Sequence, residues 1–355
     1  MSRRRTALSD LGERAILADV LAPRYRTVTG FGDDSAVLGA PAGVGDIVAT
    51  TDTCPTPLVA QLGDTDPYHA GWLLVTINLS DLAAAGASPL GLVVNYTLPA
   101  DTPVDDLERL LAGVDECAAE HHTRVVGGDL RDGTPTHLSA TAVGQCAPGC
   151  RVGRRGASVG DRLVLVGSPG YLWAEALVAG GRVTTLSPDD AAALAARARR
   201  PKAQLAAGRL LAEAGFTRAA MDVSDGLFAS VRALCEVNGV GARMSEDVRL
   251  DPVPAAVCRA AGVRPFDLAA TWGDWCLLVA VGPTDAGTAV AKLAAEGCAA
   301  QVVGRVVDAH AGITLDTGGR TVPWEGVAQE RFSARSWHGG DLTGWLAAMV
   351  PSAAG

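Results

Sequence analysis

Aspartates beside glycine, serine or threonine recur along the chain, where a strand or helix is predicted to begin or end. The positions are Asp33/Asp34, Asp52, Asp81, Asp129 and Asp222/Asp225. One such site is common in a turn, but five in one chain favour a cluster of divalent cations, because carboxylates repel one another unless metal ions or protons compensate. Carboxylate and hydroxyl oxygens suit Mg²⁺, which also takes water and substrate phosphate. The alternative is a set of ordinary loop aspartates.

The basic residues restrict what such a cluster binds. The formal net charge is −9, and the only lysines are Lys202 and Lys292. No GxxxxGK[ST] phosphate loop is present, so a bound nucleotide has its charge met by metal ions and arginine. Two or three Mg²⁺ ions bridging a triphosphate would explain both the aspartates and the scarcity of lysine. The acidic balance also argues against nucleic acid as a partner.

The elements that position these aspartates are strands and helices in alternation. Residues 66–87 are predicted to form one long helix or a helix pair, whose small residues after Asp81 permit a close approach to neighbouring backbone. Residues 46–53 and 219–222 read as strands that end in carboxylates. Residues 123–129 read as a short strand ending in Gly-Gly-Asp.

Length and composition indicate a folded chain of two domains. The 355 residues are 48% hydrophobic and 19% charged, which permits a substantial core. We place an N-terminal domain at 1–149, a C-terminal domain at 150–332 and a tail at 333–355. The eight cysteines are scattered and are expected to be reduced, as in a cytoplasmic protein, and no apolar run long enough to span a membrane occurs.

Six short motifs occur in the order and approximate spacing found in thiamine-monophosphate kinases, which the chain resembles from about Gly12 to Trp324. They are Gly32-Asp33-Asp34-Ser35-Ala36, Thr51-Asp52-Thr53, Asn78 to Ala87, Gly127-Gly128-Asp129, Arg154-Arg155-Gly156-Ala157 and Asp222 to Leu227. The resemblance implies the two-domain α/β fold of aminoimidazole-ribonucleotide synthetase-like enzymes. It also implies an N-terminal sheet that pairs across a homodimer, and ATP bound with several Mg²⁺ ions.

Carried over position by position, the resemblance assigns a role to each motif. The implied metal-binding residues are Asp34, Thr50, Thr51, Asp52, Asp81, Asp129, Asp222 and Asp225, and those assigned to catalysis are Asp81, Asp129 and Asp225. The implied ATP contacts are Gly128, Arg154 and Ser224. Metal ions and Arg154 would neutralise and align the phosphates, so that no covalent nucleophile is needed.

The chain departs from the family pattern where the second substrate is expected. Val59 stands where the family has a histidine, and Gly273 stands where it has a glutamate, although Asp274 is retained. Trp324 matches an aromatic residue that stacks on the family's substrate. We therefore expect the ATP end to be intact and the acceptor end to be altered.

These observations predict a magnesium-dependent ATP phosphotransferase. It either makes thiamine diphosphate or, as Val59 and Gly273 favour, phosphorylates a different small molecule. One alternative is an ATP-dependent ligase that activates a carboxylate or amide in a specialised biosynthetic pathway. The other is a nucleotide-binding protein without turnover, against which the complete set of metal-type aspartates argues.

Overall fold

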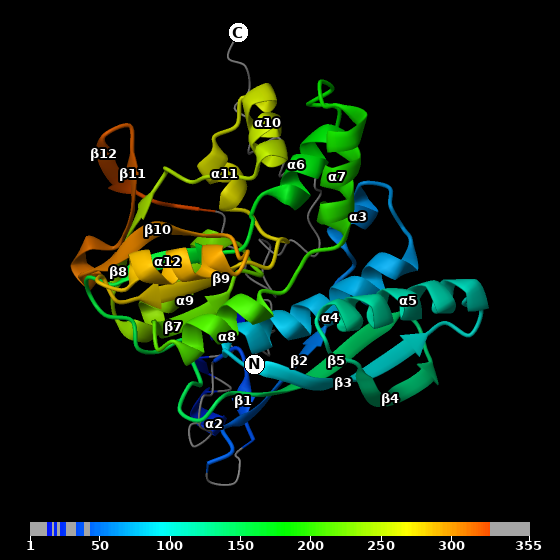
Figure 1. Ribbon diagram of the computed structural model, residues 1–355. Helices are drawn as coiled ribbons and strands as arrows, with labels where there is room; N and C mark the ends of the chain where they lie inside the picture. Colours follow the sequence, from blue (N-terminus) through cyan, green and yellow to red (C-terminus); the bar gives the residue numbers. More distant parts are fainter. Residues whose placement is uncertain (1–12, 16–17, 20–21, 26–32, 39–42, 327–355) are drawn as a thin grey trace, which may run out of the picture.

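Two β-sheets with their covering helices make up the chain in the computed structural model (Figure 1). The structure describes residues 13–15, 18–19, 22–25, 33–38 and 43–326, so the predicted tail 333–355 lies outside the described residues. Two short helices, α1 (Glu13–Ala15) and α2 (Ala22–Tyr25), precede the first sheet. None of the described helices is both long enough and apolar enough to cross a membrane.

The first sheet has five strands in the order β1-β2-β5-β3-β4. Their bounds are Ala36–Val37 (β1), Ile47–Thr53 (β2), Ser88–Leu98 (β3), Val125–Asp132 (β4) and His137–Gln145 (β5). Buried and more exposed residues alternate along β5, because one face of the sheet is covered and the other is open. The helices α4 (Pro67–Ala84) and α5 (Val104–Glu120) cover the buried face, and α3 (Leu58–Gln61) precedes them.

The second sheet has seven strands in the order β12-β11-β8-β10-β6-β9-β7. Their bounds are Arg162–Val166 (β6), Thr217–Asp222 (β7), Gly241–Ser245 (β8), Leu277–Val281 (β9), Ala300–Val307 (β10), Ile313–Thr317 (β11) and Arg320–Pro323 (β12). The helices of this half are α6 (Tyr171–Ala179), α7 (Pro188–Arg199), α8 (Leu205–Glu213), α9 (Leu227–Asn238), α10 (Pro252–Ala261), α11 (Pro265–Ala269) and α12 (Ala286–Ala295), with a 3₁₀ turn at Ala309–Ala311. Every neighbouring pair is antiparallel except β8 and β11.

Helix α4 lies between the two halves of the molecule. It contacts β2, β5 and α5 on one side and α8, β7 and β9 on the other, and almost all of its residues are buried (Figure 1). Asp66 caps its first turn by accepting a hydrogen bond of 2.9 Å from the Tyr68 amide. The single helix confirms that residues 66–87 are largely helical.

Small residues bring the neighbours of α4 into backbone contact. A Cβ atom on Gly113 of α5 would lie 2.0 Å from the Tyr68 carbonyl oxygen, and one on Gly208 of α8 would lie 2.0 Å from that of Ala83. No side chain fits at such distances, so glycine is required at both positions. Helix α4, which carries Asp81, is thus packed in backbone contact with α5 on one side and α8 on the other.

One strand prediction differs from the structure. The strand predicted to end at Gly-Gly-Asp continues through these residues to Asp132, because its backbone pairs with β3 along its whole length. In the second sheet, β9 begins only at Leu277, and residues 272–276 before it form a turn. Both features affect where candidate functional residues lie.

Candidate active site

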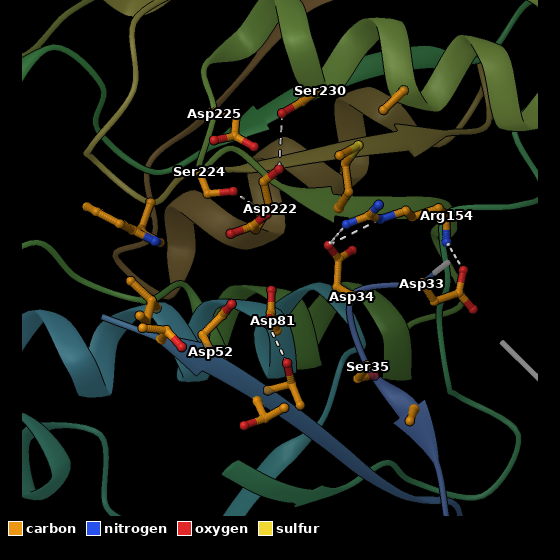
Figure 2. A pocket seen from close by; sticks show the side chains of 18 of the residues that line it. Asp33, Asp34, Ser35, Asp52, Asp81, Arg154, Asp222, Ser224, Asp225 and Ser230 are labelled. Carbon is orange, nitrogen blue, oxygen red and sulfur yellow. Dashed lines mark hydrogen bonds and ion pairs between the residues drawn. The ribbon is translucent and has the colours of Figure 1, made fainter. Parts of the chain in front are cut away.

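Three aspartates from distant parts of the chain converge between the two sheets. Asp34 precedes β1, Asp81 lies on α4, and Asp222 ends β7; each offers a carboxylate oxygen within 4.8 Å of the other two (Figure 2). Asp52 and Asp225 line the same cavity, which has a volume of about 660 Å³. Six aspartates and one arginine are among its lining residues; we call it the acidic cavity and define it by Asp33, Asp34, Asp52, Asp81, Asp222, Asp225 and Arg154.

Strand β2 and helix α4 are joined by side chains at this point. The Thr50 hydroxyl donates a hydrogen bond of 2.5 Å to Asp81 Oδ2. One helical turn before Asp81, buried Asn78 accepts a hydrogen bond of 3.2 Å from the Asp52 amide. Asn78 also donates to the Leu74 carbonyl at 2.9 Å. These bonds fix the strand end that carries Asp52 against the helix that carries Asp81.

The turn after β7 holds Asp222 in a similar way. Ser224 Oγ donates to Asp222 Oδ1 at 3.1 Å, and Ser230 Oγ donates to the Asp222 carbonyl at 3.1 Å (Figure 2). Gly226, with φ of +90°, lets the chain turn from the strand into α9. The Asp-x-Ser-Asp-Gly motif is thus a strand-to-helix turn that places both of its aspartates in the lining of the acidic cavity.

Arg154 brings the one positive charge among the residues that line the acidic cavity. Its guanidinium donates to Asp34 Oδ1, with an Nε–Oδ1 distance of 3.2 Å, and its backbone amide donates to Asp33 Oδ1 at 2.9 Å. Burial acts to lower the pKa of Arg154, but the charge of Asp34 and its hydrogen bond outweigh it and raise the pKa, so the partly buried guanidinium stays charged. A guanidinium in this place can bind phosphate oxygens with two parallel hydrogen bonds.

The crowded carboxylates alter one another's protonation. Burial, together with the charges of Asp222, Asp52 and Asp34, raises the pKa of Asp81 well above its ordinary value. Burial and the Asp34 charge raise the pKa of Asp222 to about 8, although Arg154 opposes the shift. Both carboxyl groups are therefore disfavoured as anions until protons or cations compensate them.

A second, smaller cavity adjoins the acidic one. It has a volume of about 30 Å³, and Pro55, Ser224 and Trp275 line both cavities. Most of its other lining residues are apolar, and we call it the apolar cavity; it is lined by Pro57, Leu58, Val59, Leu73, Leu172, Trp272, Gly273, His69 and Arg199 among others. The two altered positions of the sequence, Val59 and Gly273, thus lie in the same wall.

The turn at 272–276 forms part of that wall in an unusual conformation. Gly273 has φ of +97° and Trp275 has φ of +47°, a region that bulky side chains rarely occupy. Asp274 accepts hydrogen bonds from the Gly170 amide at 2.6 Å and the Leu172 amide at 3.2 Å, at the start of α6. Asp274, predicted to contact substrate, therefore ties this turn to α6 and lies outside the lining of both cavities.

Other predicted residues lie apart from the acidic cavity in this single chain. Gly128 and Asp129 lie within β4, which is separated from β2 by β3 and β5. At about 4.8 Å per strand this separation is roughly 14 Å. Trp324 packs edge-to-face on Phe228 and Phe266, with ring centroids 5.0 and 5.2 Å away. The roles assigned to Gly128, Asp129 and Trp324 stay predictions.

Thr51 borders the acidic cavity but points to the other face of β2 from its neighbours Thr50 and Asp52. Side chains alternate along a strand, and the Thr51 hydroxyl donates to the Ala140 carbonyl at 2.9 Å. The roles carried over from the resemblance included none for Asn78. Asn78 was detectable, because it lies three residues before Asp81 and so on the same helix face.

Comparison with known proteins identifies related sequences and structures. Residues 32–146 match the AIR synthase related protein N-terminal domain, and residues 158–316 match the corresponding C-terminal domain. The thiamine-monophosphate kinase of Synechococcus elongatus is 32% identical over 314 residues, covering 85% of this chain and 90% of the relative. That of Mycobacterium tuberculosis is 31% identical over 316 residues, covering 87% and 89%.

Solved structures are similar over nearly the whole chain. One described as AaThiL complexed with AMPPCP and TMP superposes with a TM-score of 0.75 at 26% identity, covering 91% of this chain and 98% of the other. That protein therefore binds an ATP analogue and a second small molecule together. The two-domain fold expected from the sequence is confirmed.

Proposed function

The chain belongs to the AIR synthase-related family and is a thiamine-monophosphate-kinase-like, ATP-dependent phosphotransferase; from this premise we propose that its acceptor is a small molecule other than thiamine monophosphate. The observation that carries the proposal is the apolar cavity, which opens beside the aspartate cluster at Ser224 and Trp275. No carboxylate is among its lining residues, and Arg199, which does line it, is paired with Asp64 and Glu175. A cationic ring entering there would find no uncompensated carboxylate in the lining.

We assign magnesium to the acidic cavity because its residues fit that ion. Asp34, Asp81 and Asp222 present oxygens at a spacing that one cation can bridge, and six aspartates would repel an uncompensated triphosphate. Bound Mg²⁺ would supply charge neutralisation at the phosphate oxygens and alignment of the transferred group. We assign Asp52 and Asp225, which line the same cavity, to a further ion.

The protein's own residues then hold and orient the phosphates. Thr50 keeps Asp81 pointing into the cavity, and Ser224 does the same for Asp222. Arg154 would exchange its bond with Asp34 for a phosphate oxygen when a cation takes over that carboxylate. Since no nucleophilic side chain is required, the acceptor oxygen attacks the γ-phosphorus directly and ADP leaves.

We also propose that two chains pair through the open face and edge of the first sheet. Val93 of β3 and Val126 and Leu130 of β4 are between 45% and 61% exposed, and β4 is an edge strand. An exposed apolar edge of this kind favours pairing with a second copy. A Val126→Glu, Leu130→Glu variant should halve the mass measured by light scattering; an unchanged mass would contradict this pairing.

The experiment that tests the proposed function is an incubation with ATP and Mg²⁺, with and without thiamine monophosphate. Products are separated and assayed for ADP, AMP and thiamine diphosphate. We expect Mg²⁺-dependent ATP binding and little thiamine diphosphate. Rapid thiamine diphosphate formation would refute the altered acceptor, and absence of ATP binding in calorimetry would refute the whole proposal. Release of inorganic phosphate together with ADP, in place of a phosphorylated product, would indicate the ligase-type alternative.

A further inference from the structure

Trp275 has a backbone conformation that is rare for a bulky side chain. Among the described residues, only His122 and Trp275 have positive φ without being glycine, at +55° and +47°. His122 follows the last turn of α5, where a left-handed residue is common. Trp275 instead lies in the turn before β9. Strain of this kind is retained only where the surrounding structure imposes it, and it is concentrated at functional sites.

Hydrogen bonds on both sides of Trp275 impose this conformation. The carboxylate of Asp274, the residue before it, accepts two amide hydrogen bonds at the start of α6. The carbonyl of Cys276, the residue after it, accepts a hydrogen bond of 2.8 Å from the amide of Val223 in the Asp-x-Ser-Asp-Gly turn. The backbone at Trp275 is thus fixed between α6 and the turn that carries two aspartates of the acidic cavity.

The side chain of Trp275 lies at the border between the two cavities. It packs with Leu73 and Ile77 of α4 in one buried cluster, and Trp275 lines both cavities. Leu73 lines the apolar cavity, and Ile77 lines the acidic cavity. Because Leu73, Ile77 and Asp81 recur every four positions, they lie on one face of α4. The indole therefore packs on the helix face that carries Asp81, about one turn before it.

This position determines which part of an acceptor meets Trp275. An oxygen that attacks a phosphate held at the aspartates lies in the acidic cavity, so the atoms next to that oxygen come against the residues that border both cavities. Among these, the indole offers the largest flat surface, on which other rings pack offset or edge-on. No carboxylate lines the apolar cavity beyond it, so a charged group there would lose its hydration without gaining a counter-charge. An uncharged ring fits this place.

We propose that Trp275 determines acceptor specificity by packing its indole on an uncharged ring next to the oxygen that receives the phosphoryl group. This inference rests on the proposed function and specifies its substrate class: a small molecule whose phosphorylatable group is attached to a ring directly or through a short link. Trp275 is a specificity-determining residue and takes no part in bond making. Its anchored neighbours, Asp274 and Cys276, hold the indole in place before the acceptor arrives.

The test uses two probes that share a phosphate group and differ in the ring, phenyl phosphate and methyl phosphate. Each is titrated by calorimetry into the full chain saturated with Mg²⁺ and AMPPCP. We expect phenyl phosphate to bind about tenfold more tightly, because burial of the ring against the indole adds to the affinity that the phosphate gives to both probes.

Four variants locate the effect. Trp275→Ala should lower the preference to about twofold or less, and Trp275→Phe, which keeps a ring, should retain most of it. Trp275→Gly also removes the ring but tolerates positive φ, so it should share the low preference of Trp275→Ala while melting about 2 °C higher. Phe216→Ala, at a partly buried aromatic residue that lines neither cavity, is the control and should keep the full preference. A preference that follows the ring, and not the melting temperature, distinguishes recognition from a merely structural role.

Equal affinity of both probes for the unaltered chain, failure of both to bind, or a preference that survives Trp275→Ala would overturn the inference. Failure of the proposed function gives a different result: with ATP in place of AMPPCP, thiamine monophosphate would be converted rapidly to thiamine diphosphate, or bound probe would produce no ADP above the rate without probe. In either case the probe affinities would still show that Trp275 binds a ring, and the proposed acceptor or the phosphoryl transfer would fall.

Discussion

The two neighbouring cavities of this protein differ in what defines them. The acidic cavity is defined by charge: carboxylates from four separate segments meet, and those of Asp34, Asp81 and Asp222 are each held by a guanidinium or hydroxyl partner. The apolar cavity is defined by shape, namely the positive φ of Gly273 and Trp275 and the side chains packed around one histidine. The first is suited to a cation and phosphate, and the second to an uncharged group.

The difference fits the proposed function, in which the fold keeps its ATP chemistry and the acceptor is changed. The aspartates constrain one another electrostatically, so a change at any one alters the balance of the rest. The apolar wall has no such coupling. Val59, which stands where the family has a histidine, and His69 line the same small cavity. Single substitutions at such positions can change the shape of the cavity without disturbing the aspartates.

The largest expected effect on activity comes from removing one carboxylate from the acidic cavity. Asp81→Asn should lower ATP turnover by at least about a hundredfold, because it removes a charged oxygen at the point where cation and phosphate charge concentrate. The variant should still fold. When EDTA removes divalent cations, its melting temperature should be higher than that of wild type, because the repulsion between position 81 and the carboxylates of Asp34 and Asp222 is relieved. ADP release and thermal unfolding measure the two effects. Exposed Asp247→Asn is the control, and turnover equal to wild type would remove Asp81 from the site.

A smaller loss should follow from removing a group that only orients Asp81. Thr50→Val deletes the hydroxyl that donates to Asp81 at 2.5 Å, and we expect about a tenfold fall in ATP turnover. Thr50→Ser keeps the hydroxyl and should retain most activity. The concentration of Mg²⁺ giving half-maximal rate should rise in the valine variant alone; equal values for valine and serine would show that the hydroxyl has no such role.

How much the sequence could predict also differs between the cavities. Asp34, Asp81 and Asp222 were identifiable because each stands beside small or hydroxyl residues at the end of an element, and the structure places their oxygens within 4.8 Å. Asp129 has the same local signature, yet it lies in the middle of a strand roughly three strand spacings away in this chain. The residues on either side of an aspartate do not show which strands are neighbours in the sheet, so they could not show that Asp129 lies far from the other aspartates.

The apolar cavity was only partly predictable, for a different reason. The resemblance assigned Val59 and Gly273 to the acceptor end, but no charge or spacing in the sequence links them to His69, which lines the same cavity. Asp274 was predicted to contact substrate, whereas its carboxylate accepts two amide hydrogen bonds at the start of α6. Whether an aspartate such as Asp274 binds a ligand or accepts hydrogen bonds from the amides at a helix start depends on how the surrounding segments pack. The sequence alone does not specify that packing.

Adding a side chain at Gly273 should destabilise the folded protein for two separable reasons. A Cβ atom there would lie 2.2 Å from Leu172 Cδ2, and φ is +97°. Gly273→Ala should therefore lower the free energy of unfolding by about 2–3 kcal/mol in urea titrations. Gly297→Ala has positive φ of +72° but nothing within 4 Å, so it should lose only about 1 kcal/mol. Equal losses would mean that Leu172 moves aside freely.

The smallest effect should come from Asp274, which holds the 272–276 turn on α6. Burial raises its pKa to about 6 from an ordinary value of 3.8, although the amides of Gly170 and Leu172 oppose the shift. Between these pH values the folded protein binds the proton more tightly than the unfolded chain, so this group's stabilisation is complete below pH 4 and is lost as pH rises through 6. The difference in unfolding free energy between wild type and Asp274→Asn should therefore shift by about 1 kcal/mol from pH 5 to pH 7, with wild type relatively more stable at pH 5. A difference that stays constant across this range would mean that the two amide hydrogen bonds outweigh burial and that Asp274 fixes the wall of the apolar cavity as a full anion.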